Sequence, residues 1–135
     1  MNIPPTAPRT DADLIFSYSR AQAIADGVLV DASTGPLAQI SRQTYKYPIA
    51  MTAEVFFIIE QAADNPLLHN DLTGIWHDIM WMSLRYIIAR PDPATVLFQV
   101  KITGIEDREI FTFKLVVGPG DNAEPVITLM LPDQD

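Results

Sequence analysis

Cysteine is absent from this 135-residue chain, and histidine occurs only twice. Without cysteine there is no disulfide and no thiolate metal site. The two histidines, His69 and His77, do not have the spacing of three or four residues that paired ligands on a helix need. G-x-S-x-G, P-loop and G-x-G-x-x-G motifs are missing too. The sequence therefore predicts no metal, no cofactor and no catalytic residue.

Long apolar runs are also lacking. No window approaches the ~18 uninterrupted apolar residues of a membrane-spanning helix, and residues 1–13 lack the basic and apolar segments of a signal peptide. We therefore expect a cytoplasmic protein without membrane contact. The length suits a single domain, residues 1–135, in which the Pro-rich residues 1–13 form a loosely attached, flexible arm.

Positive charge is in short supply. Nine basic residues stand against 17 acidic ones, which gives a net charge of −8. Direct nucleic-acid binding needs clustered Lys and Arg, so the balance argues against it. An acidic protein could instead imitate nucleic acid towards a basic partner. No acidic run exceeds two residues, however, and the pattern favours a role of the charge in solubility.

Capping residues and apolar spacing predict four helices. Ser19, Thr52 and Asp71 are suitable N-caps, and Gly27 can end the first helix in the left-handed conformation. A short buried strand follows at residues 28–30, whereas residues 47–52 are expected to be an extended link. The predicted helices cover residues 20–26, 36–44, 53–64 and 72–90.

In the last third of the chain the apolar period changes to two, which is typical of strands. Residues 95–104, 109–117 and 126–132 predict an antiparallel meander, with a long hairpin loop at 118–125. The sequence thus predicts an α+β fold: N-terminal helices with one early strand, then a C-terminal β-meander packed on a long central helix. The side chains expected to be largely buried are Val28, Leu29, Val30, Trp76, Ile79, Phe98, Val100, Phe113, Leu115, Ile127 and Leu129.

The long helix carries the strongest group of candidate binding residues: His77, Trp81 and Arg85 at intervals of four, with Asp78 beside them. Arg85 could stack on Trp81 and still reach a carboxylate or phosphate. Alternatively, Trp81 packs under another element and Arg85 pairs with a neighbouring acid. Because a helix that is apolar almost all round is usually covered on most sides, the sequence favours this alternative.

Other candidates lie on loops, on the preceding helix and on the meander. Asp121 and Glu124 share the 118–125 loop and could bind a cation or a basic partner, although acids in turns are usually just solvated. Phe57 falls among polar positions of its helix, which predicts exposure or a contact between subunits. Lys101 and Lys114 should share the outer face of the meander, offset from each other or neutralised by an acid. This face could dock an anion or an acidic partner, although a solvated outer face is favoured.

Four stretches of the chain, in order, resemble a family of small bacterial proteins of unknown function: YSRAQAIADGVLVDAS (18–33), PIAMTAEVFFII (48–59), GIWHDIMWMSLRYII (74–88) and GPGDNAEPVITLMLPDQD (118–135). Members of that family are often met on plasmids, phages and other mobile elements. The resemblance implies an accessory role on mobile DNA and implies no activity.

Composition, motifs and resemblance together favour a non-enzymatic protein that acts through contacts with another protein, and a homodimer is left open. Two alternatives stay open. One is an acidic inhibitor of a nucleic-acid-binding host defence protein. The other is a small enzyme that uses the strip of Trp81 and Arg85.

Overall fold

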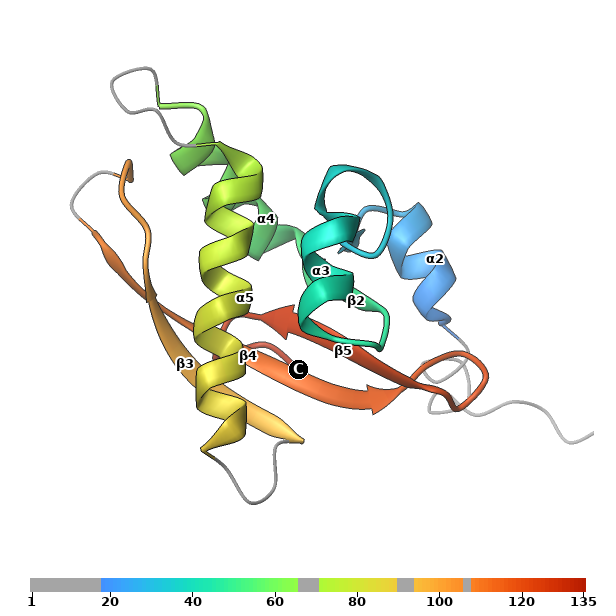
Figure 1. Cartoon of the computed structure of the whole chain (residues 1–135). Coiled ribbons are helices and arrows are strands. Elements are labelled where there is room, and N and C mark those ends of the chain that lie inside the picture. The colour runs from blue at the N-terminus through green and yellow to red at the C-terminus, as the bar shows by residue number, and fades with distance from the viewer. Residues whose placement is uncertain (1–17, 66–70, 90–93, 106–107) are drawn as a thin grey trace, which may run out of the picture.

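The computed structural model describes residues 18–65, 71–89, 94–105 and 108–135. The predicted arm, residues 1–13, and His69 lie outside the described residues. The chain order of the elements is visible in Figure 1. They are α2 (Arg20–Ala25), β1 (Leu29–Asp31), the 3-10 turn η1 (Gly35–Leu37), α3 (Ala38–Thr44), β2 (Ile49–Thr52), α4 (Ala53–Ala63), α5 (Leu72–Ile88), β3 (Thr95–Lys101), β4 (Ile110–Pro119) and β5 (Pro125–Met130).

The predicted helix starts are confirmed. The side chains of Ser19, Thr52 and Asp71 each accept a hydrogen bond from a backbone N–H in the first turn of α2, α4 and α5. These bonds satisfy donors that have no partner inside the helix. Gly27 adopts φ +79°, so it ends α2 as predicted, in a conformation that side-chain-bearing residues rarely take.

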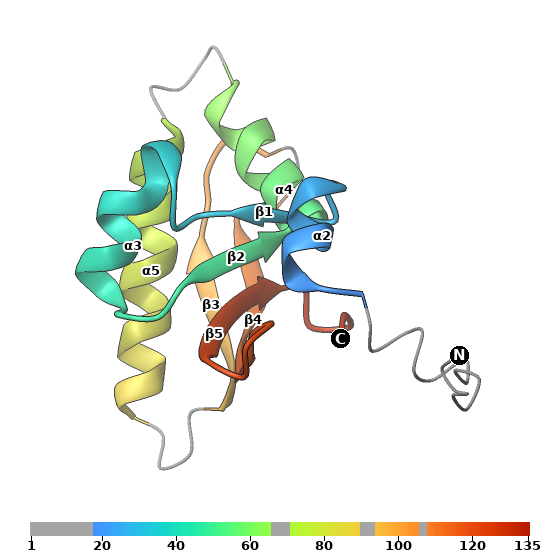
Figure 2. The ribbon, with the colours of Figure 1, turned by 90° about the vertical axis from the view of Figure 1, so that its right-hand side faces the viewer.

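A five-stranded sheet in the order β1-β2-β5-β4-β3 forms the centre of the fold. The antiparallel meander β3-β4-β5 is confirmed, and α5 contacts β3 while α4 contacts β5. Within the predicted extended link, residues 47–52, Ile49–Thr52 is extended, but it is a strand that pairs in parallel with β5 and not only a link. β2 thereby joins β1 to the meander, as Figure 2 shows. The sheet is therefore mixed.

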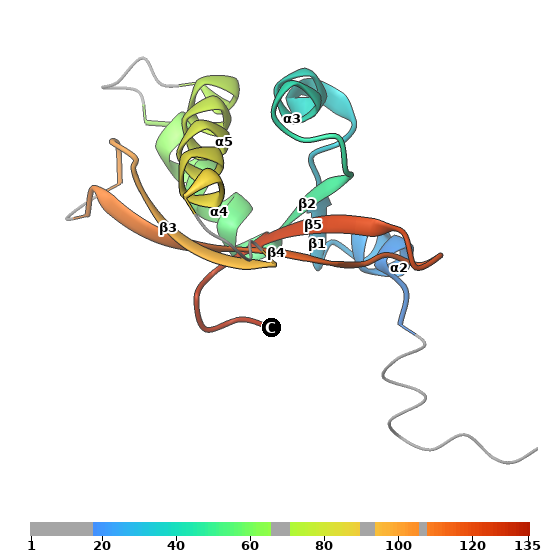
Figure 3. The same cartoon turned by 60° about the horizontal axis from the view of Figure 1, so that its bottom comes forward.

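The two faces of the sheet are covered differently. Helices α3, α4 and α5 lie on one side, and the C-terminal segment crosses the other (Figure 3). The alternation of β3 follows from this arrangement: Val96, Phe98 and Val100 are buried under the helices, whereas Leu97 and Gln99 are exposed. On the outer face, Gln134 of the C-terminal segment hydrogen-bonds Thr52 and Glu54 at the start of α4.

Most of the predicted core is confirmed. Trp76, Ile79 and the predicted side chains of β3, β4 and β5 are buried in one cluster. The prediction for Val28 is wrong, since its side chain is 52 % exposed. The Val28 N–H donates a hydrogen bond to the carbonyl of Ala23, and the Val28 carbonyl accepts one from the N–H of Ala53. Val28 therefore stabilises the turn through its backbone and not through its side chain. Leu29 and Val30 are half-buried because β1 is an edge strand.

Candidate functional site

Helix α5 buries one face and exposes the other. Ile75, Trp76, Ile79, Met80 and Ser83 point into the core at helical spacing. The opposite side carries His77, Asp78, Trp81, Arg85 and Ile88, which we call the α5 strip; all five are exposed. Trp81 is 53 % and Ile88 76 % exposed. The expectation that α5 is covered on most sides, with Trp81 beneath another element, is therefore wrong: α3 and α4 leave this side of the helix open.

The geometry of the α5 strip groups its polar side chains in two pairs. The guanidinium of Arg85 lies 6.0 Å from the centre of the Trp81 ring, a distance suited to a cation–π contact. In the described part of the chain, no carboxylate oxygen lies within 4.0 Å of the Arg85 guanidinium, so Arg85 has no ion pair there. His77 Nδ1 lies 3.4 Å from Asp78 Oδ1. Arg85 thus keeps its donors available beside an exposed aromatic ring.

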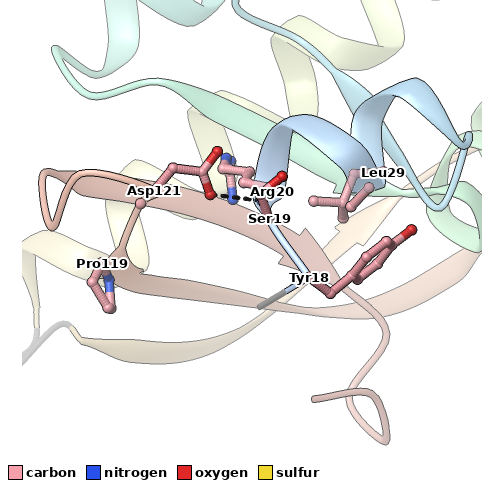
Figure 4. Close-up of a pocket in the computed structure, with 8 residues that line it drawn as sticks. Tyr18, Ser19, Arg20, Leu29, Pro119 and Asp121 are labelled. Carbon is pink, nitrogen blue, oxygen red and sulfur yellow. Dashed lines mark hydrogen bonds between the residues drawn. The ribbon is translucent and has the colours of Figure 1, made fainter. Parts of the chain in front are cut away.

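Asp121 and Glu124 have internal partners. The carboxylate of Asp121 accepts a hydrogen bond from the backbone N–H of Arg20 at 2.7 Å (Figure 4). It accepts a second from the backbone N–H of Ala21 at 3.1 Å. It therefore satisfies the first donors of α2 from a loop about 100 residues away. Glu124 Oε1 accepts from Asn122 N at 2.9 Å and so closes its own loop. That loop is shorter than predicted, because Gly118 and Pro119 still pair with β5.

Arg20 is a residue of this region that the sequence did not single out. Its guanidinium donates to Thr128 Oγ1 at 2.8 Å and to the carbonyl of Ile127 at 2.7 Å, which ties α2 to β5. Burial lowers the pKa of the guanidinium, and the negative charges of Asp31, Asp121 and Glu124 oppose that effect. A cavity of about 600 Å³ lies beside Arg20 and Asp121. An arginine directly after a predicted N-cap was the available signal.

Lys101 and Lys114 lie on the outer face of the meander and do not oppose each other, as predicted. Lys101 pairs across the sheet with Ile110, and Lys114 with Leu97. Lys101 Nζ lies 3.6 Å from Glu109, and Lys114 Nζ donates to the carbonyl of Gln134. The C-terminal segment therefore occupies Lys114, and the two lysines do not form an open basic face.

Phe57 projects from α4 and is 60 % exposed, which confirms the expected exposure. Its contact with a second subunit stays a prediction. In the described ranges, no group of three His, Cys, Asp or Glu side chains is arranged to hold a metal ion. Nor does any helix in those ranges combine the length and the apolar character needed to cross a membrane.

Comparison with known protein families gives a match over most of the chain. The family model of DUF6573, a family of unknown function, matches residues 9–135. The chain belongs to this family. The DUF6573 match includes every helix and strand described above. No curated protein and no solved structure matches the sequence.

Proposed function

We propose that this DUF6573 protein is a non-enzymatic accessory protein that binds another protein through the α5 strip. The observation that carries the proposal is the exposed Trp81 ring with the Arg85 guanidinium 6.0 Å from its centre. Tryptophan and arginine are the residue types most enriched among those that dominate protein interfaces. Ile88 extends the apolar part of the strip by two helical turns.

The exposed surface of Trp81 is large enough to matter energetically. A tryptophan buries roughly 200 Å², so covering the exposed half removes about 100 Å² from water and contributes about 2.5 kcal/mol. Arg85 would offer its planar fork to a carboxylate of the partner. The partner we expect has an apolar socket for the indole with an acidic side chain at its rim. The side chains of the strip are exposed and do not line the Arg20 cavity, which favours binding over catalysis.

We further propose that the protein works in the cytoplasm of a bacterium and serves a plasmid, phage or similar element. The resemblance of residues 18–33, 48–59, 74–88 and 118–135 to proteins met on such elements supports this setting.

A capture experiment with three single variants tests the binding proposal. Trp81→Ala and Arg85→Ala change the strip, and Ile110→Ala truncates an equally exposed apolar side chain on β4 as a control. Each tagged protein is incubated with host lysate, and the captured proteins are quantified by mass spectrometry. We expect at least one protein to be retained by wild type and Ile110→Ala and lost from both strip variants. Identical captured sets for all four proteins would refute the proposal.

A further inference from the structure

A second cavity, of about 390 Å³, lies between the turn that follows β1 and the segment that joins α3 to β2. Ser33 lines it from the turn, and Arg42, Tyr45, Lys46 and Tyr47 line it from the other side. Its volume falls in the range of about 300–1,000 Å³ that is usual for small-molecule sites. None of these residues belongs to the α5 strip.

The charge of this cavity is opposite to that of the protein. Arg42 and Lys46 are two of nine basic residues in a chain of net charge −8. Across the part of the chain that the structure describes, neither has a carboxylate within 4.0 Å. The nearby Asp31 accepts hydrogen bonds from Ser33 N and Thr34 Oγ1, both at 2.9 Å, so its oxygens are engaged in the turn. Two exposed cations therefore line the same concave surface.

Hydrogen bonds that do not involve a ligand hold two lining residues of the cavity, Ser33 and Tyr45, in place. Ser33 Oγ accepts from Ile49 N at 2.7 Å and donates to the carbonyl of the same residue at 3.2 Å. Ser83 Oγ donates to the carbonyl of Met80, so the Tyr45 hydroxyl, 2.7 Å away, is the donor of their bond. A site whose walls are fixed in advance loses little freedom when a ligand binds.

An aromatic ring, that of Tyr47, lines the cavity together with the two basic side chains. Tyr47 is 38 % exposed, and Lys46 Nζ lies 5.9 Å from its ring centre. An exposed tyrosine face can stack with a nucleobase, since every base has a π-face. Arginine matches a phosphate with its fork of donors, and lysine adds a point charge. The cavity thus combines a phosphate-binding pair with an aromatic surface.

We propose that this cavity binds a nucleoside monophosphate, with the phosphate held by Arg42 and Lys46 and the base against Tyr47. The site does not involve the α5 strip, so the nucleotide-binding proposal can be tested independently of the protein-binding proposal. An inorganic anion could use the two cations alone, whereas a nucleotide also needs the ring.

Calorimetric titration with defined probes tests this site. The probes are the four ribonucleoside monophosphates, the matching nucleosides and inorganic phosphate. We expect saturable binding of at least one nucleotide, with affinity about tenfold or more above that of its nucleoside and of phosphate. Arg42→Gln with Lys46→Gln should lower that affinity by about tenfold or more, as should Tyr47→Leu.

The control carries the same change of charge elsewhere. Lys101→Gln with Arg108→Gln removes two exposed basic side chains from the meander and should leave nucleotide affinity unchanged. Thermal melts of all variants verify folding. The proposal is overturned if no nucleotide binds, if phosphate binds as tightly as the nucleotide, or if the cavity variants keep full affinity. Equal losses in both double variants would also overturn it, because they would indicate non-specific attraction.

Discussion

Ser41→Ala should destabilise the protein by an amount that follows from one buried hydrogen bond. Trp76 Nε1 donates to Ser41 Oγ at 2.9 Å, and both residues are buried, Ser41 on α3 and Trp76 on α5. Alanine leaves the indole N–H without this acceptor, and an unsatisfied buried donor costs about 1–3 kcal/mol. We therefore expect the free energy of unfolding to fall by about 2 kcal/mol.

The melting temperature gives a second measure of this loss. An unfolding entropy of about 2.1 cal/mol/K per residue gives about 0.28 kcal/mol/K for 135 residues, so 2 kcal/mol corresponds to about 7 °C. Urea unfolding and thermal melts followed by circular dichroism measure both quantities. Gln43→Ala, at an exposed position of the same helix, is the control and should stay within about 0.5 kcal/mol of wild type.

A double-mutant cycle separates the hydrogen bond from packing. Trp76→Phe removes the donor, so Ser41→Ala should cost at least about 1 kcal/mol less in that background than in wild type. The reasoning is refuted if Ser41→Ala costs under about 0.5 kcal/mol in wild type, or if its cost is the same in both backgrounds.

Three further predictions concern the contacts of the outer sheet face and of α2. Asp121→Ala should lower the free energy of unfolding, measured by urea denaturation, by about 1 kcal/mol, as loss of a helix cap does. An unchanged free energy of unfolding would contradict the capping role. Lys101→Met should cost under about 0.5 kcal/mol because its ion pair is exposed. Lys114→Met should cost about 1 kcal/mol through its lost bond to Gln134, and equal costs for the two lysines would contradict this. The hydrogen bond from Gln134 lowers the pKa of the Glu54 carboxyl. This bond therefore contributes to the free energy of unfolding above the ordinary pKa of glutamate, and the contribution is lost as pH falls through the lowered pKa. Gln134→Ala should raise the Glu54 pKa in an NMR titration, and the difference in free energy of unfolding between this variant and wild type should shrink in acid. An unchanged Glu54 pKa would show that the bond does not stabilise the ionised carboxylate.

Local features of the fold could be read from the sequence because their causes are local. Ser19, Thr52 and Asp71 each bond a backbone N–H three residues ahead, and those residue types at those positions predict the bond. The two-residue period of β3 likewise predicts which side chains the helices cover. Neither inference needs information about distant parts of the chain.

Non-local features could not be read in the same way. β2 has four residues after Pro48, and its strand character comes from pairing with β5, as in Ile49 with Ile127. Trp81 is exposed because α3 and α4 contact other sides of α5. The spacing of apolar residues along the helix does not reveal which sides its neighbours cover. The cavity beside α3 combines Ser33 with Arg42 and Lys46. Two basic residues four apart in an acidic chain were the available signal.

Site-specific photocrosslinking in living host cells tests the central claim, protein binding through the α5 strip, most directly. A photoreactive amino acid replaces His77, one turn before Trp81 in the strip, or Gln99, on the outer face of the sheet. We predict a discrete crosslinked product with a second protein from position 77, lost when Trp81→Ala is added, and no such product from position 99. The claim is contradicted if position 77 gives no product, or if both positions give the same one.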